Sequence, residues 1–126
     1  MKTIKGVLVD TKNGIKEIAL EIKDYTDIVD LCKCDYITCV TRKIGGVIVD
    51  VYCDEEALLK SAREPSIITR KNGTIIEVLF GNCFICKHNR NGDIMSLSRN
   101  EIAKVLDAKA SMWTNGKDFD VLQSEF

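Results

Sequence analysis

The sequence predicts an α+β fold: a small, mainly antiparallel β-sheet domain of about six strands with two helices. Two observations carry this prediction. Short runs rich in Val and Ile are separated by turn-forming pairs such as Asn-Gly and Gly-Gly, and two other segments have the i, i+3, i+4 apolar spacing of a helix. With 126 residues, 45% of them hydrophobic and 29% charged, the chain is expected to fold as an ordinary globular protein.

Two hairpins are predicted from apolar runs on either side of tight turns. Residues 2–9 and 15–22 flank Asn13 and Gly14, a pair that supplies the positive backbone angles of a reversal. A second hairpin is expected over 36–53, around a Gly-Gly turn. Val47, Val49, Val51 and Cys53 alternate along its second strand and should share a buried face.

Two segments predict helices. Thr26 is expected to cap a helix over 27–34. Ser98 and Glu101 form a capping box, which predicts a second helix directly after Ser98. The buried stripe of that helix is expected to consist of Ile102, Val105 and Leu106.

The remaining segments complete the expected domain of residues 1–110. Asp54 is expected to cap a single helical turn over 55–60, and residues 61–74 are expected to be loop or turn. Two further strands are predicted at 74–81 and 82–88.

A separate tail is predicted over residues 111–126. It contains Trp113, Phe119, Val121, Leu122 and Phe126. A segment this apolar should not remain free in solvent. We therefore expect the tail to pack on the domain or on a partner subunit.

Charge and hydropathy restrict the function classes. The 18 Lys and Arg residues against 19 Asp and Glu residues give a formal net charge of −1, whereas a general nucleic-acid binder usually has a basic surplus. No apolar run reaches the ~20 residues needed to span a bilayer, and the N-terminus lacks the apolar core of a signal peptide. We expect a cytoplasmic protein whose six cysteines are free thiols.

The cysteines and the single histidine are the first candidates for chemistry. Cys83 and Cys86 form a CxxC motif that could bind zinc together with Cys32 and Cys34. On a strand, residues i and i+3 point to opposite faces, so core packing is favoured over metal or redox chemistry. His88 shares a face with Cys86, but a solvated histidine is favoured over a catalytic base. Because no GxGxxG, GxxxxGK[ST] or HExxH motif is present either, we expect neither an enzyme nor a cofactor.

Binding residues are indicated more weakly. Phe84 can stack on a base or pack in the core, and periodicity favours the core. Asn91 and Asp93 belong to a polar turn whose residue types contact ribose and phosphate, although a solvated turn has the same composition. Lys104 and Lys109 can serve solubility and the dipole of the last helix.

An ordered series of short motifs adds a family resemblance. MKTIKGVLVD, RKIGG, VDVYCDEEALLK, GNCFIC and NGDIMSLS, spread over about residues 1–108, resemble small phage and prophage proteins, the Thoeris anti-defence sponges of the first-described type. The resemblance implies a protein that is not an enzyme. It implies binding and sequestration of the cyclic ADP-ribose isomers that bacterial TIR-domain proteins make, in the cytoplasm of the bacterial host. It also implies a dimer or a trimer of dimers, with the ligand at a subunit interface.

The resemblance also implies roles for individual residues. Phe84, the aromatic of the GNxFI stretch, would stack on the adenine. Asn91 or Asp93 would contact the ribose, and Lys104 or Lys109 would face the pyrophosphate. Some family members hold cyclic di- or trinucleotides at a second site, for which the candidates here are Arg63 and Arg70.

A rival interpretation places the function on the surface of the protein. A small phage or mobile-element domain can inhibit a host protein by binding to it, and residues 113–126 would then be the contact.

Overall fold

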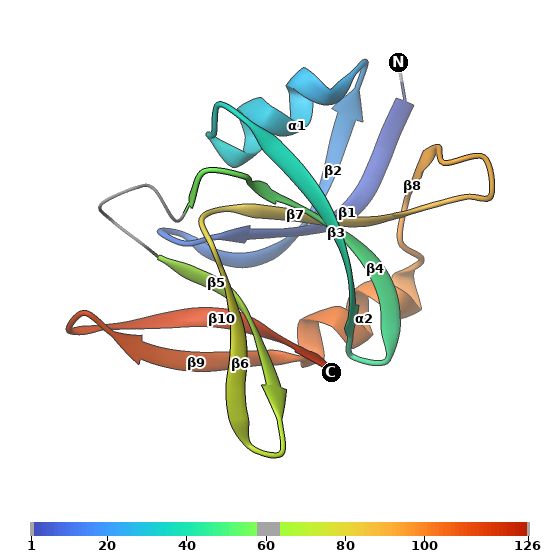
Figure 1. The fold of residues 1–126 in the computed structure, drawn as a ribbon. Coiled ribbons are helices and arrows are strands. Elements are labelled where there is room, and N and C mark those ends of the chain that lie inside the picture. Colours follow the sequence, from blue (N-terminus) through green and yellow to red (C-terminus); the bar gives the residue numbers. More distant parts are fainter. Residues whose placement is uncertain (1, 58–63, 126) are drawn as a thin grey trace.

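The computed structural model of the protein describes residues 2–57 and 64–125. Within these ranges the chain forms ten strands and two helices (Figure 1). Their bounds are β1 (Lys2–Asp10), β2 (Gly14–Ile22), α1 (Tyr25–Cys32), β3 (Ile37–Ile44), β4 (Val47–Asp54), β5 (Pro65–Lys71), β6 (Thr74–Phe80), β7 (Cys83–His88), β8 (Ile94–Met95), α2 (Arg99–Asp107), β9 (Lys109–Thr114) and β10 (Lys117–Glu125).

The prediction of an α+β domain with about six strands is therefore wrong. The described chain is mainly β, with one ten-stranded sheet and two short helices. The six expected strands are present as β1 to β4, β6 and β7. The four additional strands are β5, within the segment predicted to be loop, and β8, β9 and β10.

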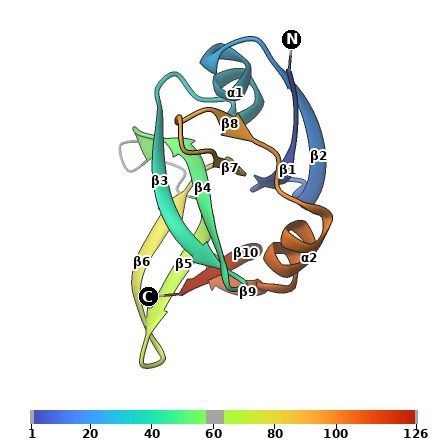
Figure 2. The ribbon, with the colours of Figure 1, turned by 90° about the vertical axis from the view of Figure 1, so that its right-hand side faces the viewer.

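The sheet has the order β2-β1-β7-β4-β3-β10-β5-β6, with β8 paired to β7 and β9 paired to β10. Neighbouring strands are antiparallel except β10 and β5, which are parallel. Figure 2 shows that β3 and β4 run the length of the molecule, from the end near α1 to the end where β9 and β10 cross beneath them. The C-terminal hairpin thus belongs to the same sheet as the N-terminal one.

The hairpins follow from their turn residues, and the two expected near the start of the chain are confirmed. Asp10 pairs with Gly14 at the end of β1–β2, and Ile44 pairs with Val47 at the end of β3–β4. The alternating residues of β4 also share a buried face as predicted. They belong to one core cluster: Val47, Val49, Val51 and Cys53.

Both helices begin with a capping box. For α1, the N-cap is Asp24 rather than the predicted Thr26, and Thr26 donates its amide to the Asp24 carboxylate. For α2, the predicted pair of Ser98 and Glu101 is confirmed. Neither helix in the described part of the chain is long and apolar enough to cross a membrane. The predicted helical turn over 55–60 extends beyond the described residues.

The central strands β1, β4 and β7 are buried on both faces because one helix covers each face. The cluster beneath α2, which we call the α2 core, contains Val7, Val51, Cys83, Ile85, Ile102 and Val105 among others. The cluster beneath α1, the α1 core, consists of Ile4, Ile22, Ile28, Cys32, Tyr52, Phe84 and Cys86. Cys83 and Cys86 thus point to opposite faces of β7, as predicted.

Candidate ligand-binding site

Phe84 lies inside the α1 core and is 0% exposed. Its ring packs against Gly6 of β1, where an added Cβ would come within 3.1 Å of the ring and 2.2 Å of the Ile85 carbonyl oxygen. The ring has no exposed face on which a base could stack. The role in adenine stacking is therefore corrected: in this conformation Phe84 is a core residue.

The predicted ribose contacts lie in the turn between β7 and β8. Asn91 and Asp93 are both exposed. Asn89 organises the turn, because its Oδ1 accepts the amides of Asn91 at 2.9 Å and Asp93 at 3.0 Å, and its Nδ2 donates to Asp93 Oδ2 at 3.2 Å. The Asp93 carboxylate is thus held in a fixed position at the surface.

The predicted basic residues lie elsewhere in the fold. Lys104 is exposed on α2, and Lys109 is exposed at the start of β9. Arg70 lies on β5, where its guanidinium contacts the carbonyl of Gly73 at 3.4 Å. Arg63 lies outside the described residues. Within one protomer these positions belong to different elements from the β7–β8 turn (Figure 1).

The cysteine and histidine chemistry considered above has a clear structural context. Burial raises the pKa of Cys86 to about 12, so its thiol is protonated and a poor nucleophile. His88 is not simply solvated, because its Nδ1 lies 2.6 Å from Oδ2 of the buried Asp50. Among the described residues, no group of three or more His, Cys, Asp and Glu side chains is arranged to hold a metal ion.

A wide groove lies between the start of β1, the start of α1 and the β7–β8 turn. Its volume is about 580 Å³, within the usual range for sites that hold small molecules. We call it the Tyr25 groove. It is lined by Lys2, Ile22, Lys23, Asp24, Tyr25, Gly92, Asp93 and Ile94.

Tyr25 gives this groove an aromatic wall. It is the first residue of α1 and is 57% exposed, although its ring also contacts Tyr52 with the centroids 6.0 Å apart. Because the buried Tyr52 supports it from behind, the ring is held in place while most of its surface faces solvent. Sequence reasoning missed Tyr25, although an aromatic residue beside Lys23 at a helix start was a visible signal.

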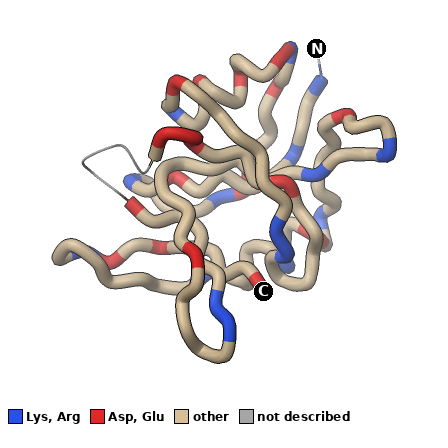
Figure 3. The backbone as a smooth tube through the Cα atoms, in the orientation of Figure 1, with Lys and Arg blue, Asp and Glu red and all other residues tan. Residues whose placement is uncertain are grey.

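The charges of the groove are mixed. Lys2 donates from its ammonium to the carbonyl of Ile94, which fixes the start of β1 beside β8. Lys23 adds a second ammonium, and Asp24 and Asp93 add two carboxylates, of which that of Asp24 accepts the Thr26 amide. Across the described chain, acidic and basic residues are interspersed without a large region of one sign (Figure 3). The two ammonium groups beside the Tyr25 ring are thus a property of this groove and do not belong to a larger basic surface.

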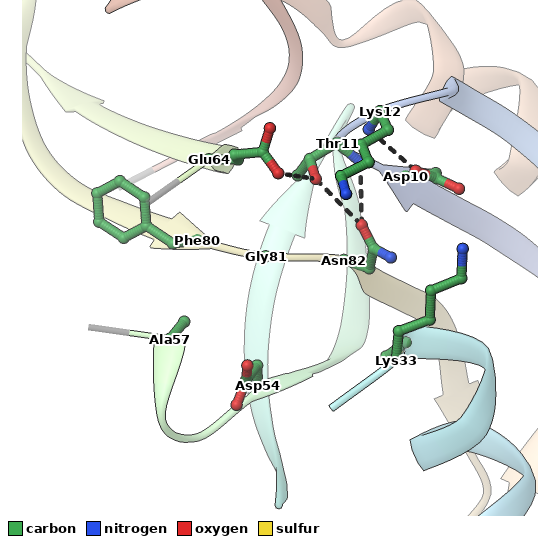
Figure 4. Close-up of a pocket in the computed structure, with 11 residues that line it drawn as sticks. Asp10, Thr11, Lys12, Lys33, Asp54, Ala57, Glu64, Phe80, Gly81 and Asn82 are labelled. Atoms are coloured by element: carbon green, nitrogen blue, oxygen red, sulfur yellow. Dashed lines mark hydrogen bonds between the residues drawn. The ribbon is translucent and has the colours of Figure 1, made fainter. Parts of the chain in front are cut away.

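A second, smaller cavity of about 250 Å³ lies beside the connection between β6 and β7. We call it the Asn82 pocket, after the residue at its centre (Figure 4). The turn between β1 and β2, the end of α1 and residues of the 54–57 and 80–82 segments line it. None of its described lining residues is among those predicted to bind a ligand.

Comparison with known proteins assigns the chain to a family. No curated protein and no solved structure matches it. One family matches residues 4–109, and its description reads "Domain of unknown function (DUF3846)". Because this match covers most of the 126 residues, the chain belongs to the DUF3846 family.

Proposed function

We propose that this protein is a non-enzymatic sponge that binds and sequesters cyclic ADP-ribose-type signals made by bacterial TIR proteins. The proposed place of action is the cytoplasm of the host bacterium. The observation that carries the proposal is the Tyr25 groove, which joins an exposed aromatic ring to two ammonium groups and two carboxylates, of which Asp24 caps α1 and Asp93 lies in the β7–β8 turn.

Each part of a cyclic ADP-ribose has a complementary group in the groove. The adenine can stack on Tyr25, an interaction worth about 1–3 kcal/mol per base. The pyrophosphate can pair with Lys2 and Lys23, and a ribose hydroxyl can donate to the Asp93 carboxylate. Among the described residues, Asp93 is thus the one predicted ligand contact that lines this groove.

Sequestration needs tight binding and slow release, and it needs no bond to be broken. The described residues that line the groove include no Cys or Ser that could act as a nucleophile and no His that could act as a general base. The groove is open to solvent on one side, so we propose that a second copy of the chain covers the ligand in a dimer or a trimer of dimers.

A second candidate function is inhibition of a host protein through surface contact. One observation favours it: Trp113 on β9 is 67% exposed, an unusual position for a tryptophan. In that case the β9–β10 hairpin would be the contact, and the protein would bind no small molecule.

Calorimetric titration with a panel of cyclic ADP-ribose isomers and cyclic oligonucleotides tests the proposal. We expect the wild-type protein to bind at least one cyclic ADP-ribose isomer. Tyr25→Ala should weaken that binding by about one to two decades, because the stacking surface is lost. Tyr25→Phe keeps the ring and should bind as the wild type does.

Tyr36 provides a matched control, because it is also a surface tyrosine and is 60% exposed, but it does not line the groove. Tyr36→Ala should leave the affinity unchanged. If no isomer binds to the wild-type protein, the sponge function is wrong. If an isomer binds and Tyr25→Ala has no effect, the ligand occupies another site.

A further inference from the structure

The Asn82 pocket is separate from the Tyr25 groove and has a different chemical character. It lies where the β1–β2 turn, the C-terminal end of α1 and the Gly81–Asn82 connection meet. Figure 4 shows Lys12 and Lys33 approaching Asn82 from different sides, with Glu64 on the opposite wall. Its volume of about 250 Å³ suits a ligand smaller than a nucleotide.

Asn82 has a fixed orientation. Its side-chain oxygen accepts the Thr11 backbone amide at 3.0 Å, and the Thr11 hydroxyl lies 3.3 Å from the same oxygen. A backbone amide can only donate, so the oxygen of Asn82 must face Thr11 and the amide nitrogen must face away from it. That nitrogen points toward Lys33 and offers two N–H donors to the cavity (Figure 4).

Two ammonium groups stand beside this amide. Lys12 follows Thr11 in the β1–β2 turn, and Lys33 is the C-cap residue of α1, with φ of 54°. Neither ammonium has an ion-pair partner within 4 Å among the described residues. The Asp10 carboxylate also lines the pocket. It accepts the amides of Lys12 at 2.9 Å and Asn13 at 3.1 Å, and these hydrogen bonds together with the charge of Lys33 hold its pKa below the usual value.

The opposite wall accepts hydrogen bonds instead of donating them. Glu64 Oε1 lies 3.1 Å from the Thr11 hydroxyl, and Asp54 also lines the cavity. Carboxylates at this position suit hydroxyl groups, which can donate to them. They would repel a second phosphate, so a ligand with one anionic end and one hydroxyl-bearing end fits the pocket best.

We propose that the Asn82 pocket is a second binding site, which takes a small phosphate monoester whose organic part carries hydroxyl groups. The phosphate lies among Lys12, Lys33 and Asn82, where two cations and an amide donate charge-assisted hydrogen bonds. The hydroxyl groups of the ligand lie toward Glu64. This site is independent of the sponge function, because its described lining residues are all different from those of the Tyr25 groove.

Calorimetric titration with ribose 5-phosphate tests this proposal, with ribose and inorganic phosphate as separate arms. We expect saturable binding of one ribose 5-phosphate per chain, and weaker binding of inorganic phosphate and of ribose. Asn82→Asp keeps the acceptor for Thr11 but replaces the amide donor by a negative charge. It should therefore weaken binding at least about tenfold while the protein stays folded.

Three further variants make the result specific. Lys33→Gln should also weaken binding about tenfold, since it removes one charge and keeps a long side chain. Lys16→Gln, an exposed position on β2 outside the pocket, should change nothing. Tyr25→Ala should bind ribose 5-phosphate normally, which separates this site from the proposed sponge site.

Two outcomes would overturn the proposal. One is a wild-type protein that does not bind ribose 5-phosphate, or that binds inorganic phosphate equally well. The other is binding that survives both Asn82→Asp and Lys33→Gln, which would place the anion elsewhere. Because Lys33 is exposed, that variant tests the site even if the Asn82 substitution disturbs the fold.

Discussion

Phe84 lies in the middle of β7. Its chain neighbours Cys83 and Ile85 point to the opposite face and belong to the α2 core, whereas the Phe84 ring packs against Gly6 of β1. Residues with no exposed surface contribute through packing, and an aromatic ring fills more space than any aliphatic side chain can. Tyr25, by contrast, leaves most of its ring in solvent. Loss of the Phe84 ring should therefore mainly lower stability, and loss of the Tyr25 ring should mainly weaken ligand binding.

Phe84→Ala is expected to lower the free energy of unfolding by about 3–5 kcal/mol, because it opens a cavity in the α1 core. Urea unfolding followed by circular dichroism measures this loss. Tyr25→Ala, at a surface position, should cost far less stability. A Phe84→Ala protein with wild-type stability and lost ligand binding would restore the stacking role for Phe84.

At the scale of elements, the β3–β4 turn is fitted closely to α2. Gly45 has φ of 60°, and an added Cβ would lie 2.1 Å from the Lys104 carbonyl oxygen. Gly46 has a similar φ of 82°, but an added Cβ there would meet nothing within 4 Å. A substitution at Gly46 therefore measures the cost of the positive φ alone, whereas one at Gly45 measures that cost together with a steric clash.

Gly45→Ala should destabilise the protein by at least about 1 kcal/mol more than Gly46→Ala, because only Gly45 combines the strained angle with a clash. Thermal melting of both variants measures the difference. Equal losses of stability would mean that α2 does not sit against this turn.

An ion pair joins two strands that are not neighbours in the sheet. Arg42 of β3 donates to Glu77 of β6 through Nε at 2.9 Å and Nη2 at 2.7 Å. These hydrogen bonds hold the pKa of Glu77 below its usual value of 4.5. A lowered pKa means that the pair stabilises the fold above pH 4.5 and that this stabilisation is lost as the pH falls through the folded-state pKa.

Glu77→Gln should therefore lower stability by about 1 kcal/mol at pH 7, a modest amount because the pair is partly exposed. At pH 3 the difference from the wild-type protein should be smaller. Urea unfolding at both pH values provides the measurement. Glu17→Gln, an exposed position on β2, is the control and should be neutral. A loss for Glu77→Gln that grows on acidification would contradict this account.

The elements that could be predicted were those with a local signal. The capping box of Ser98 and the Asn13–Gly14 turn act through neighbouring residues, so the sequence alone located them. Asn-Gly pairs also occur at 72–73 and 115–116, where both residues have positive φ, whereas at Asn13–Gly14 only the glycine does. Those turns join β5 to β6 and β9 to β10, but of these four strands only β6 was predicted.

The missed strand β5 depends on a partner that is distant in the sequence. β5 begins at Pro65, which a strand tolerates at its first residue, and it pairs in parallel with the end of β10. That pairing arises from tertiary contacts, which periodicity does not encode. β9 is different, because it alternates between exposed and half-buried residues and pairs with β10 across a local turn, so its local signal was present and was missed.

At the scale of the whole molecule, the candidate site was the part least accessible to sequence reasoning. Lys2, Tyr25 and Asp93 come from three distant segments and meet because β1 lies beside β8 and α1 packs under β2. Asp93 was identified by its residue type and turn. Tyr25 was not, because its position relative to the turn depends on the complete sheet.

The exposed apolar residues of the molecule predict self-association. Ile75 and Ile76 lie exposed on β6, which is the last strand in the sheet order, and Trp113 is exposed on β9. An apolar edge strand readily pairs with another copy. We expect light scattering at micromolar concentration to give at least twice the mass of one chain, and Ile76→Lys to shift the protein toward the monomer. A wild-type monomer would contradict this prediction.

Recovery of the captured ligand shows whether the protein sequesters a cyclic ADP-ribose without cleaving it. The protein is mixed with the cyclic ADP-ribose isomer that it binds, separated from free ligand, denatured by heat, and the supernatant is analysed by mass spectrometry. A sponge releases the intact molecule in proportion to the protein. Recovery of a cleaved product, or of no ligand from any isomer tested, would contradict the account.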